Sequence, residues 1–327
     1  TDNTPDYTNT ILSKPTRVDL TYMSLLFLIH NTHDISDGNC LRLVNAALQR
    51  DLSVVIADID TLSLHKHHIG AKGFTVSEPV SVGPRNEASE LYFLSDFETI
   101  WILSLGKRDN FLDKIQLLRG AEKTTQLINS VDSLMFLKSK YSLAVYPEKF
   151  NYPESYASNN PLELLEIVES GGDWIAKPPA GSFGRKVFFL NKQTTNRLAI
   201  LNLLAGSQSE QYTLLQRYVA EISGGEKRVL IANGSIIGQY LRTPALDHRT
   251  NLMQGGIPSC CSLTIDELNY CNQIADYLQE NGALFAGIDL VFPFIIEINV
   301  LSPGGLATLE ALGGPNHANK VINQVIQ

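Results

Sequence analysis

Two apolar runs near the end of the chain carry acidic residues at matching places. The first, AGIDLVFPF, contains Asp289, the second, IIEINV, contains Glu297, and Pro293 lies midway between the two acids. Side chains two positions apart in a strand share a face, so Glu297 and Asn299 point away from the intervening isoleucines. A hairpin that turns near Pro293 would place Asp289 opposite Glu297. Two carboxylates opposed on a half-buried sheet repel each other unless a cation lies between them. The pattern therefore predicts an antiparallel sheet with a cation site.

The ligand types indicate which cation. Asp289, Glu297 and Asn299 offer hard oxygen ligands, which suit Mg²⁺ better than zinc, with Mn²⁺ as the alternative ion. Because Mg²⁺ held by few protein ligands commonly binds phosphate as well, we expect a nucleotide substrate. The sequence contains no Walker motif, so the phosphates need another cradle. WIAKPPAGSFGRKVFF offers a strand that ends at Lys177, followed by a small-residue loop whose N–H groups can close over phosphate: Gly181, Ser182, Phe183 and Gly184.

Charge and apolar content exclude several classes of protein. The 327 residues are 44% hydrophobic and 18% charged, as expected for a globular chain of two or three domains. A net charge of -8 argues against nucleic acid or an anionic membrane as the main partner, so we expect small molecules. MSLLFLIH is too short to span a bilayer and follows no charged signal-type region, which predicts a cytoplasmic protein. The four cysteines show no CxxC spacing, which is typical of reduced thiols.

The order of apolar segments predicts an α/β chain. YMSLLFLIH, CLRLVNAALQR and LSVVIADI are typical of a strand, a helix and a second strand, and TIWILSL predicts a third strand. Further along, NPLELLEIVES predicts a helix that ends at Gly171, and TIDE at 264–267 is a capping box that starts another. We therefore expect a flexible tail at 1–17, an N-terminal α/β domain at 18–128, and two further subdomains at 129–210 and 211–327.

Several motifs together resemble one family. Lys140, Lys177-Pro with its glycine loop, LLQRYVAEISGGEKRVLIANG, LRTP and GIDLVFPFIIEINVLSP occur in this order. In order and spacing they closely resemble the bacterial glutathione synthetases, which are ATP-grasp ligases. The resemblance runs from about Asn129 to Glu310, and more weakly over the βαβ start. It implies an ATP-grasp fold that holds the nucleotide between two sheets, behind an N-terminal pre-ATP-grasp domain, and a homo-oligomer.

The resemblance also implies roles for single residues. Lys140 and Lys177 would hold the phosphates under the Gly181–Gly184 loop, and Gln216 would also contact the nucleotide. The backbone of Tyr218 and Val219 would meet the adenine, and Glu226 the ribose hydroxyls. Substrate carboxylates or the transferred phosphoryl group would be bound by Arg228, Arg242 and Arg249, and Asn251 would be a further active-site amide. Guanidinium groups suit this task because they bind carboxylate and phosphate bidentately. The turn Ser302-Pro303-Gly304-Gly305 would hold the acceptor, because glycines let their N–H groups approach an anion.

The chain departs from the family pattern in three places. Gly304 and the residues after it lack the family's arginine, the segment from Arg242 to Asn251 is one residue shorter, and GKRDNF lacks the family's Pro-Pro. The expected reaction joins γ-glutamylcysteine to glycine through an acyl phosphate. A related amino-acid or peptide ligase and a non-catalytic nucleotide-binding regulator remain as alternatives.

Two local choices also stay open in the sequence. Lys138 competes with Lys140 for the nucleotide, and the resemblance favours Lys140, because its distance from Asn129 and Ser133 fits the family pattern. His65, His67 and His68 form a cluster that we expect to be a solvated loop rather than a metal site, because no acid or cysteine lies nearby in the sequence.

Overall fold

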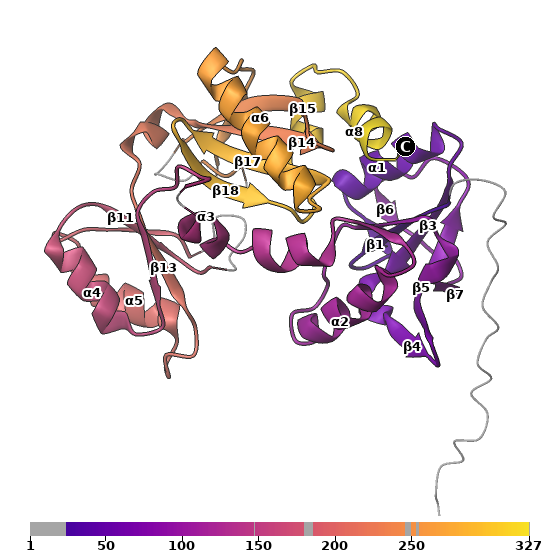
Figure 1. The fold of residues 1–327 in the computed structure, drawn as a ribbon, viewed down its shortest axis with the longest axis horizontal. Coiled ribbons are helices and arrows are strands. Elements are labelled where there is room, and N and C mark those ends of the chain that lie inside the picture. The colour runs from indigo at the N-terminus through magenta and orange to yellow at the C-terminus, as the bar shows by residue number, and fades with distance from the viewer. Residues whose placement is uncertain (1–23, 147, 180–185, 246–249, 253–254, 327) are drawn as a thin grey trace, which may run out of the picture. The chain divides into compact units, whose positions relative to one another are not determined.

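The protein divides into two compact units, Thr1–Val131 and Asp132–Gln327. The computed structural model describes residues 24–146, 148–179, 186–245, 250–252 and 255–326, drawn as coloured ribbon in Figure 1. The predicted tail at 1–17 lies outside them, and the predicted boundaries at 128 and 210 stay predictions. Within the described ranges, no helix has the length and apolarity needed to span a bilayer.

A parallel sheet forms the centre of the first unit, as the predicted βαβ start requires. Strand β1 (Ser24–Ile29) is buried along its whole length and pairs in parallel with β3 (Ser53–Asp58) and β8 (Thr99–Ile102). The remaining parallel strand is β9 (Gln126–Ile128). Strands buried on both faces require helices as covers, and two helices of this unit are α1 (Asn39–Leu48) and α2 (Phe111–Ala121).

Antiparallel strands extend this sheet where no strand was expected. β5 (His68–Val76) pairs with β3, and β4 (Ser63–His65) and β7 (Glu90–Phe93) both pair with β5. A separate two-stranded pair consists of β2 (Asp34–Ile35) and β6 (Gly83–Pro84). The loop prediction for the histidine cluster is wrong for His65 and His68, which pair across the β4–β5 hairpin. His65 Nε2 lies 2.9 Å from Ser63 Oγ, and the His68 ring lies 5.1 Å from the Phe93 ring, so neighbouring side chains hold both imidazoles.

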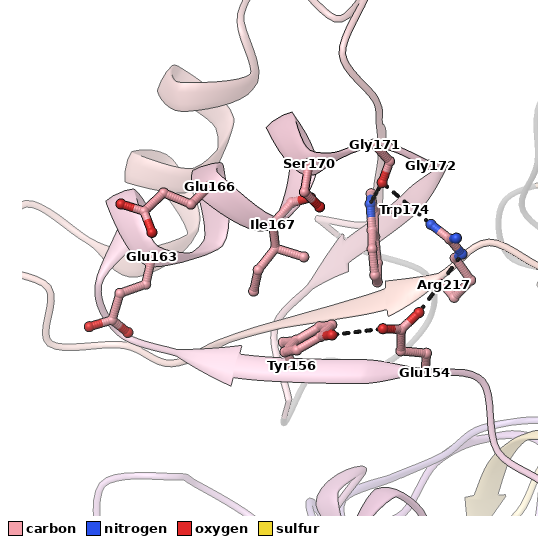
Figure 2. A pocket seen from close by; sticks show the side chains of 10 residues that line it. All are labelled: Glu154, Tyr156, Glu163, Glu166, Ile167, Ser170, Gly171, Gly172, Trp174 and Arg217. Carbon is pink, nitrogen blue, oxygen red and sulfur yellow. Dashed lines mark hydrogen bonds and ion pairs between the residues drawn. The ribbon is translucent and has the colours of Figure 1, made fainter.

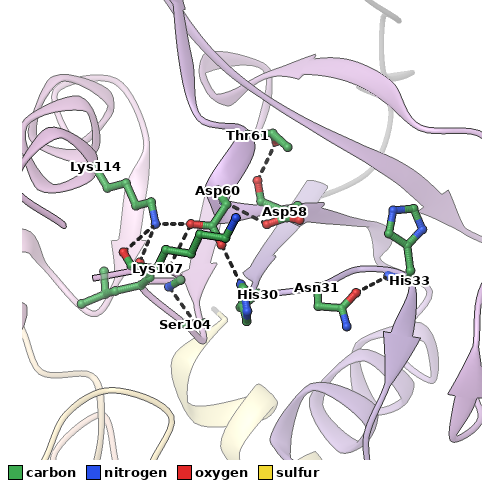
Figure 3. Close-up of polar contacts among 11 residues, drawn as sticks. His30, Asn31, His33, Asp58, Asp60, Thr61, Ser104, Lys107 and Lys114 are labelled. Atoms are coloured by element: carbon green, nitrogen blue, oxygen red, sulfur yellow. Dashed lines mark hydrogen bonds and ion pairs between the residues drawn. The ribbon is translucent and has the colours of Figure 1, made fainter. Parts of the chain in front are cut away.

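A buried ion pair orders the loop that follows β8. The Lys114 ammonium, 3% exposed, donates to Asp60 and to the carbonyls of Leu105 and Lys107 (Figure 3). Asp60 also accepts from the Lys107 N–H at 3.0 Å and lies 2.6 Å from His30 Nδ1. Burial alone would raise the pKa of Asp60, but these hydrogen bonds outweigh it and lower the pKa to about 2. The GKRDNF loop is therefore held by Lys114 and Asp60.

The second unit contains a four-stranded antiparallel sheet, the small sheet, in the order β10-β13-β11-β12. Its strands are β10 (Ser155–Ser158), β11 (Trp174–Lys177), β12 (Phe188–Leu190) and β13 (Thr213–Arg217). Helices α4 (Pro161–Ser170) and α5 (Arg197–Ala205) pack on one face through a core that includes Trp174, Ala176 and Leu215. Alternation along the strands places Lys177 and Gln216 on the opposite face, away from this core. As predicted, α4 ends at Gly171, which has a φ of 124°.

A five-stranded antiparallel sheet, the large sheet, carries the predicted hairpin. Its order is β16-β15-β14-β17-β18, from strands β14 (Glu226–Ala232), β15 (Ser235–Thr243), β16 (Ile257–Ser259), β17 (Phe285–Val291) and β18 (Phe294–Asn299). The unit also contains the helices α3 (Tyr141–Val145), α6 (Ile265–Glu280), α7 (Leu306–Ala311) and α8 (His317–Val325). The predicted capping box at the start of α6 is confirmed, since Thr264 and Glu267 satisfy each other's backbone N–H groups.

Candidate active site

The β17–β18 hairpin turns between Val291 and Phe294 and places Asp289 directly opposite Glu297, as predicted. Asn299 lies two pairs further along, opposite Gly287, and its amide is 3.4 Å from Asp289 Oδ2. Asp289 is buried, whereas the Glu297 side chain is 31% exposed. The three oxygen-bearing side chains thus converge on one face of the large sheet.

Arginines neutralise the buried Asp289. Arg228, its neighbour across β14–β17, donates from Nε at 2.5 Å and from Nη2 at 3.0 Å, and Arg242 Nη2 lies 2.7 Å away. Burial alone would raise the pKa of Asp289, but the charges of the two arginines hold that pKa well below its usual range. The remaining Arg228 nitrogen, Nη1, donates to the Gly304 carbonyl at 2.9 Å. Arg228 therefore holds both the Asp289 carboxylate and the turn after β18 through hydrogen bonds.

A second buried carboxylate lies beside this pair. Glu226, opposite Arg242 in the β14–β15 ladder, forms a short ion pair with its Nη2 and accepts a hydrogen bond from Thr250. Arg242 Nε is buried without a hydrogen-bond partner in the described protein. Thr250 was missed from the sequence, although it lies between the predicted residues Arg249 and Asn251. The Asn251 carbonyl accepts from the Gly256 N–H at 3.2 Å, and Arg249 lies outside the described residues.

Both predicted lysines are buried in this region. Lys140 Nζ donates to Glu297 at 2.5 Å, whereas Lys138 is exposed. Lys177, at the end of β11, donates to Gln216 Oε1 at 2.8 Å. Burial and then the nearby Lys140 charge lower the pKa of Lys177 to about 8. The residues of the predicted phosphate loop, Gly181, Ser182, Phe183 and Gly184, lie outside the described residues.

The remaining predicted contacts are the backbone at Tyr218 and Val219 and the turn at Gly304 and Gly305. The Tyr218 N–H donates to the Asp173 carbonyl at 2.9 Å, and the Val219 carbonyl accepts from Ile222. These two hydrogen bonds do not use the Tyr218 carbonyl or the Val219 N–H. A Cβ added to Gly304 would meet nothing within 4 Å, whereas Gly305 has a φ of 148° and packs on Leu230. Gly305 thus has a structural reason to be glycine, and Gly304 has none in this unit.

An open groove on the small sheet offers different chemistry. Its lining, drawn in Figure 2, includes Glu154, Glu163, Glu166 and Trp174. The Arg217 guanidinium lies 4.8 Å from the centre of the Trp174 ring and donates to the Gly171 carbonyl at 3.4 Å. Three carboxylates would repel phosphates, so this groove is not the nucleotide site.

The two sheets, with Lys177 at the end of β11 on one and the carboxylate hairpin on the other, define an ATP-grasp protein. Similarity to solved structures shows the same fold. D-cycloserine synthetase DcsG matches with a TM-score of 0.64 at 12% identity, over 92% of this chain and 98% of that one. A RimK domain ATP-grasp protein from Sphaerobacter thermophilus matches with a TM-score of 0.64 at 15% identity, over 93% of this chain and 100% of that one.

Residues 140–314 match the family described as prokaryotic glutathione synthetase, ATP-grasp domain, and the chain belongs to this family. The glutathione synthetase of Gloeobacter violaceus is 26% identical over 93% of this chain and 97% of its own length. That of Mesorhizobium japonicum is 32% identical over 64% of this chain and 66% of its own length. The chain is thus an ATP-dependent ligase of the ATP-grasp class, which uses ATP and Mg²⁺. Glutathione synthetase-like ligases act on small-molecule substrates.

Proposed function

We propose that this ligase joins γ-glutamylcysteine to glycine, with conversion of ATP to ADP and phosphate. The observation that carries the proposal is the pairing of Asp289 with Glu297 beside two buried lysines and two buried arginines. The names of the related proteins support the choice of substrates. In the proposed reaction the donor carboxylate attacks the γ-phosphorus of ATP, and the acceptor amine then displaces phosphate from the acyl phosphate.

In this proposal, one group of side chains binds the nucleotide, and the arginines bind the substrate or position the hairpin. Lys140 and Lys177 would neutralise the phosphates, and the Glu226 carboxylate would bind the ribose. Arg242 has an unpartnered buried Nε that can donate to a substrate carboxylate, whereas all the Arg228 nitrogens already hold Asp289 and Gly304. We therefore assign substrate binding to Arg242 and positioning of the hairpin to Arg228.

The metal ligands fit a hard divalent ion. Asp289, Glu297 and Asn299 would hold Mg²⁺, or Mn²⁺ in its place, because all three offer hard oxygen ligands. In the structure, Lys140 pairs with Glu297, and Arg228 and Arg242 pair with Asp289. The bound ion would offset the charge that develops on the phosphates.

A related amino-acid or peptide ligase is the second candidate, because Gly304 and GKRDNF depart from the family pattern on the substrate side. The test is ADP release with Mg²⁺ or Mn²⁺ across a panel of carboxylate donors and amine acceptors. We expect the highest kcat/KM with γ-glutamylcysteine and glycine. A higher value for another pair would replace this proposal, and no ADP release with any pair would favour a nucleotide-binding regulator.

Gly304→Val is expected to raise the KM for the acceptor or abolish ligation, while the KM for ATP stays near its original value. A Cβ at this position would meet nothing within 4 Å, so we expect the substitution to block a ligand rather than to disturb the fold. Steady-state kinetics with each substrate varied in turn measure the effect. Gly305→Ala is the control, because its strained φ predicts lost stability instead. Equal loss of ATP and acceptor binding in Gly304→Val would contradict this role for the turn.

ATP affinity is expected to fall by about tenfold as the pH rises from about 7.5 to about 9.5. With its pKa lowered to about 8, Lys177 loses its charge over this range and with it the attraction for phosphate. Titration calorimetry at a series of pH values measures the Kd. Lys177→Arg keeps its charge throughout and should show a flat profile. An equally steep profile in that variant would assign the pH dependence to another group.

A further inference from the structure

Tyr152 lies where the chain crosses between the two sheets of the second unit. The carbonyl of the preceding residue, Asn151, accepts from the Ile295 N–H of β18 at 3.0 Å, which ties this point to the large sheet. Three residues later, Ser155 pairs with Gln216 in the small sheet. Because an ATP-grasp protein holds its nucleotide between these sheets, Tyr152 lies at the wall of that site.

Two side chains meet at this wall with unused polar atoms. Tyr152 Oη and Gln216 Nε2 are both buried without a hydrogen-bond partner in the described part of the chain. The Tyr152 hydroxyl lies near the amide of Gln216 and near Ser155, but makes no hydrogen bond of ordinary geometry with either. A buried polar group left unpaired costs stability, so proteins rarely keep one that has no ligand to meet.

Both unused atoms can donate. Lys177 is a donor only, so its bond to Gln216 Oε1 leaves the amide N–H₂ group of Gln216 as the free end. Burial and then the charge of Glu297 raise the pKa of Tyr152, so its hydroxyl keeps its proton. A ligand at this wall must therefore present a hydrogen-bond acceptor.

We propose that Tyr152 is a nucleotide-contacting residue whose hydroxyl, together with the Gln216 amide, donates to an acceptor atom of bound ATP. The inference rests on the nucleotide site of the proposed function, and adds a residue that neither the sequence motifs nor the family resemblance assigns. It also explains why an unpaired hydroxyl is retained in a buried place, since the bond is made only when nucleotide is present.

The test compares Tyr152→Phe with the unsubstituted protein in two measurements. Titration calorimetry with MgATP, without amino-acid substrates, should show a Kd about tenfold higher, as expected for one lost hydrogen bond in a buried site. The thermal midpoint without nucleotide should be unchanged or higher, because the variant removes an unsatisfied buried group. Tyr156→Phe is the matched control: its hydroxyl pairs with Glu154 at 2.7 Å on an exposed strand, and its ATP affinity should not change.

An ATP Kd for Tyr152→Phe within twofold of the original value would overturn the inference. A weaker Kd with a lowered thermal midpoint would also overturn it, because the loss would then follow from a damaged fold. The readout does not depend on ligation. A protein that binds ATP but releases no ADP with any substrate pair would refute the proposed reaction and leave Tyr152 as a nucleotide contact, whereas no ATP binding at all would refute both.

Discussion

Glu297→Gln is expected to lower ATP-dependent turnover by about a thousandfold while the protein stays folded. The substitution keeps the shape of the side chain but removes one of the two opposed charges that would hold the metal ion in phosphoryl transfer. The side chain is 31% exposed and its Lys140 partner keeps an oxygen to bind, so the stability cost should be about 1 kcal/mol or less. ADP release and the thermal midpoint, measured on the same preparation, check both parts.

The matched control for this variant is Glu280→Gln, which makes the same change at the exposed end of α6 and should leave turnover intact. Unchanged turnover in folded Glu297→Gln protein would contradict the assignment of the hairpin as the metal site.

Asp289→Asn is expected to destabilise the fold as well as abolish turnover. Its carboxylate is the shared partner of Arg228 and Arg242, and both guanidinium groups are buried. Breaking a buried ion pair on one side leaves uncompensated charge, which costs about 3–5 kcal/mol. Urea unfolding would show this as a lower midpoint with an unchanged slope.

Asp276→Asn, on an exposed position of α6, is the control for this substitution and should change the unfolding free energy by less than about 0.5 kcal/mol. The two acids of one hairpin thus have different expected phenotypes. A free energy of unfolding for Asp289→Asn equal to that of the parent would show that the arginines find other partners.

The hairpin could be predicted because its information is local. Alternation within IIEINV and the central Pro293 are enough to place Asp289 opposite Glu297. The same holds for the βαβ start and for the capping box of α6. There, the hydrophobic periodicity and the residues that begin or end each element lie within a few positions of each other. The strand β5 was missed, because GAKGFTV contains two glycines and lacks a clean alternation.

Pairings between distant segments could not be read in the same way. Arg228 meets Asp289 across 61 positions because β14 and β17 are neighbours in the large sheet. Lys140, just before α3, meets Glu297 of β18 across 157 positions. The family resemblance named these residues but not these ion pairs. Tyr152 was missed since it lies in an irregular Pro-containing segment, where neither periodicity nor charge distinguishes a wall residue from a loop residue.

The most direct test of the proposed reaction follows oxygen from the donor to phosphate. The enzyme is incubated with MgATP, glycine and γ-glutamylcysteine labelled with ¹⁸O in its cysteinyl carboxylate, and the products are analysed by mass spectrometry. An acyl phosphate intermediate predicts one ADP for each peptide formed, and one ¹⁸O atom in each phosphate released. Peptide formation with unlabelled phosphate, or release of AMP instead of ADP, would contradict the account.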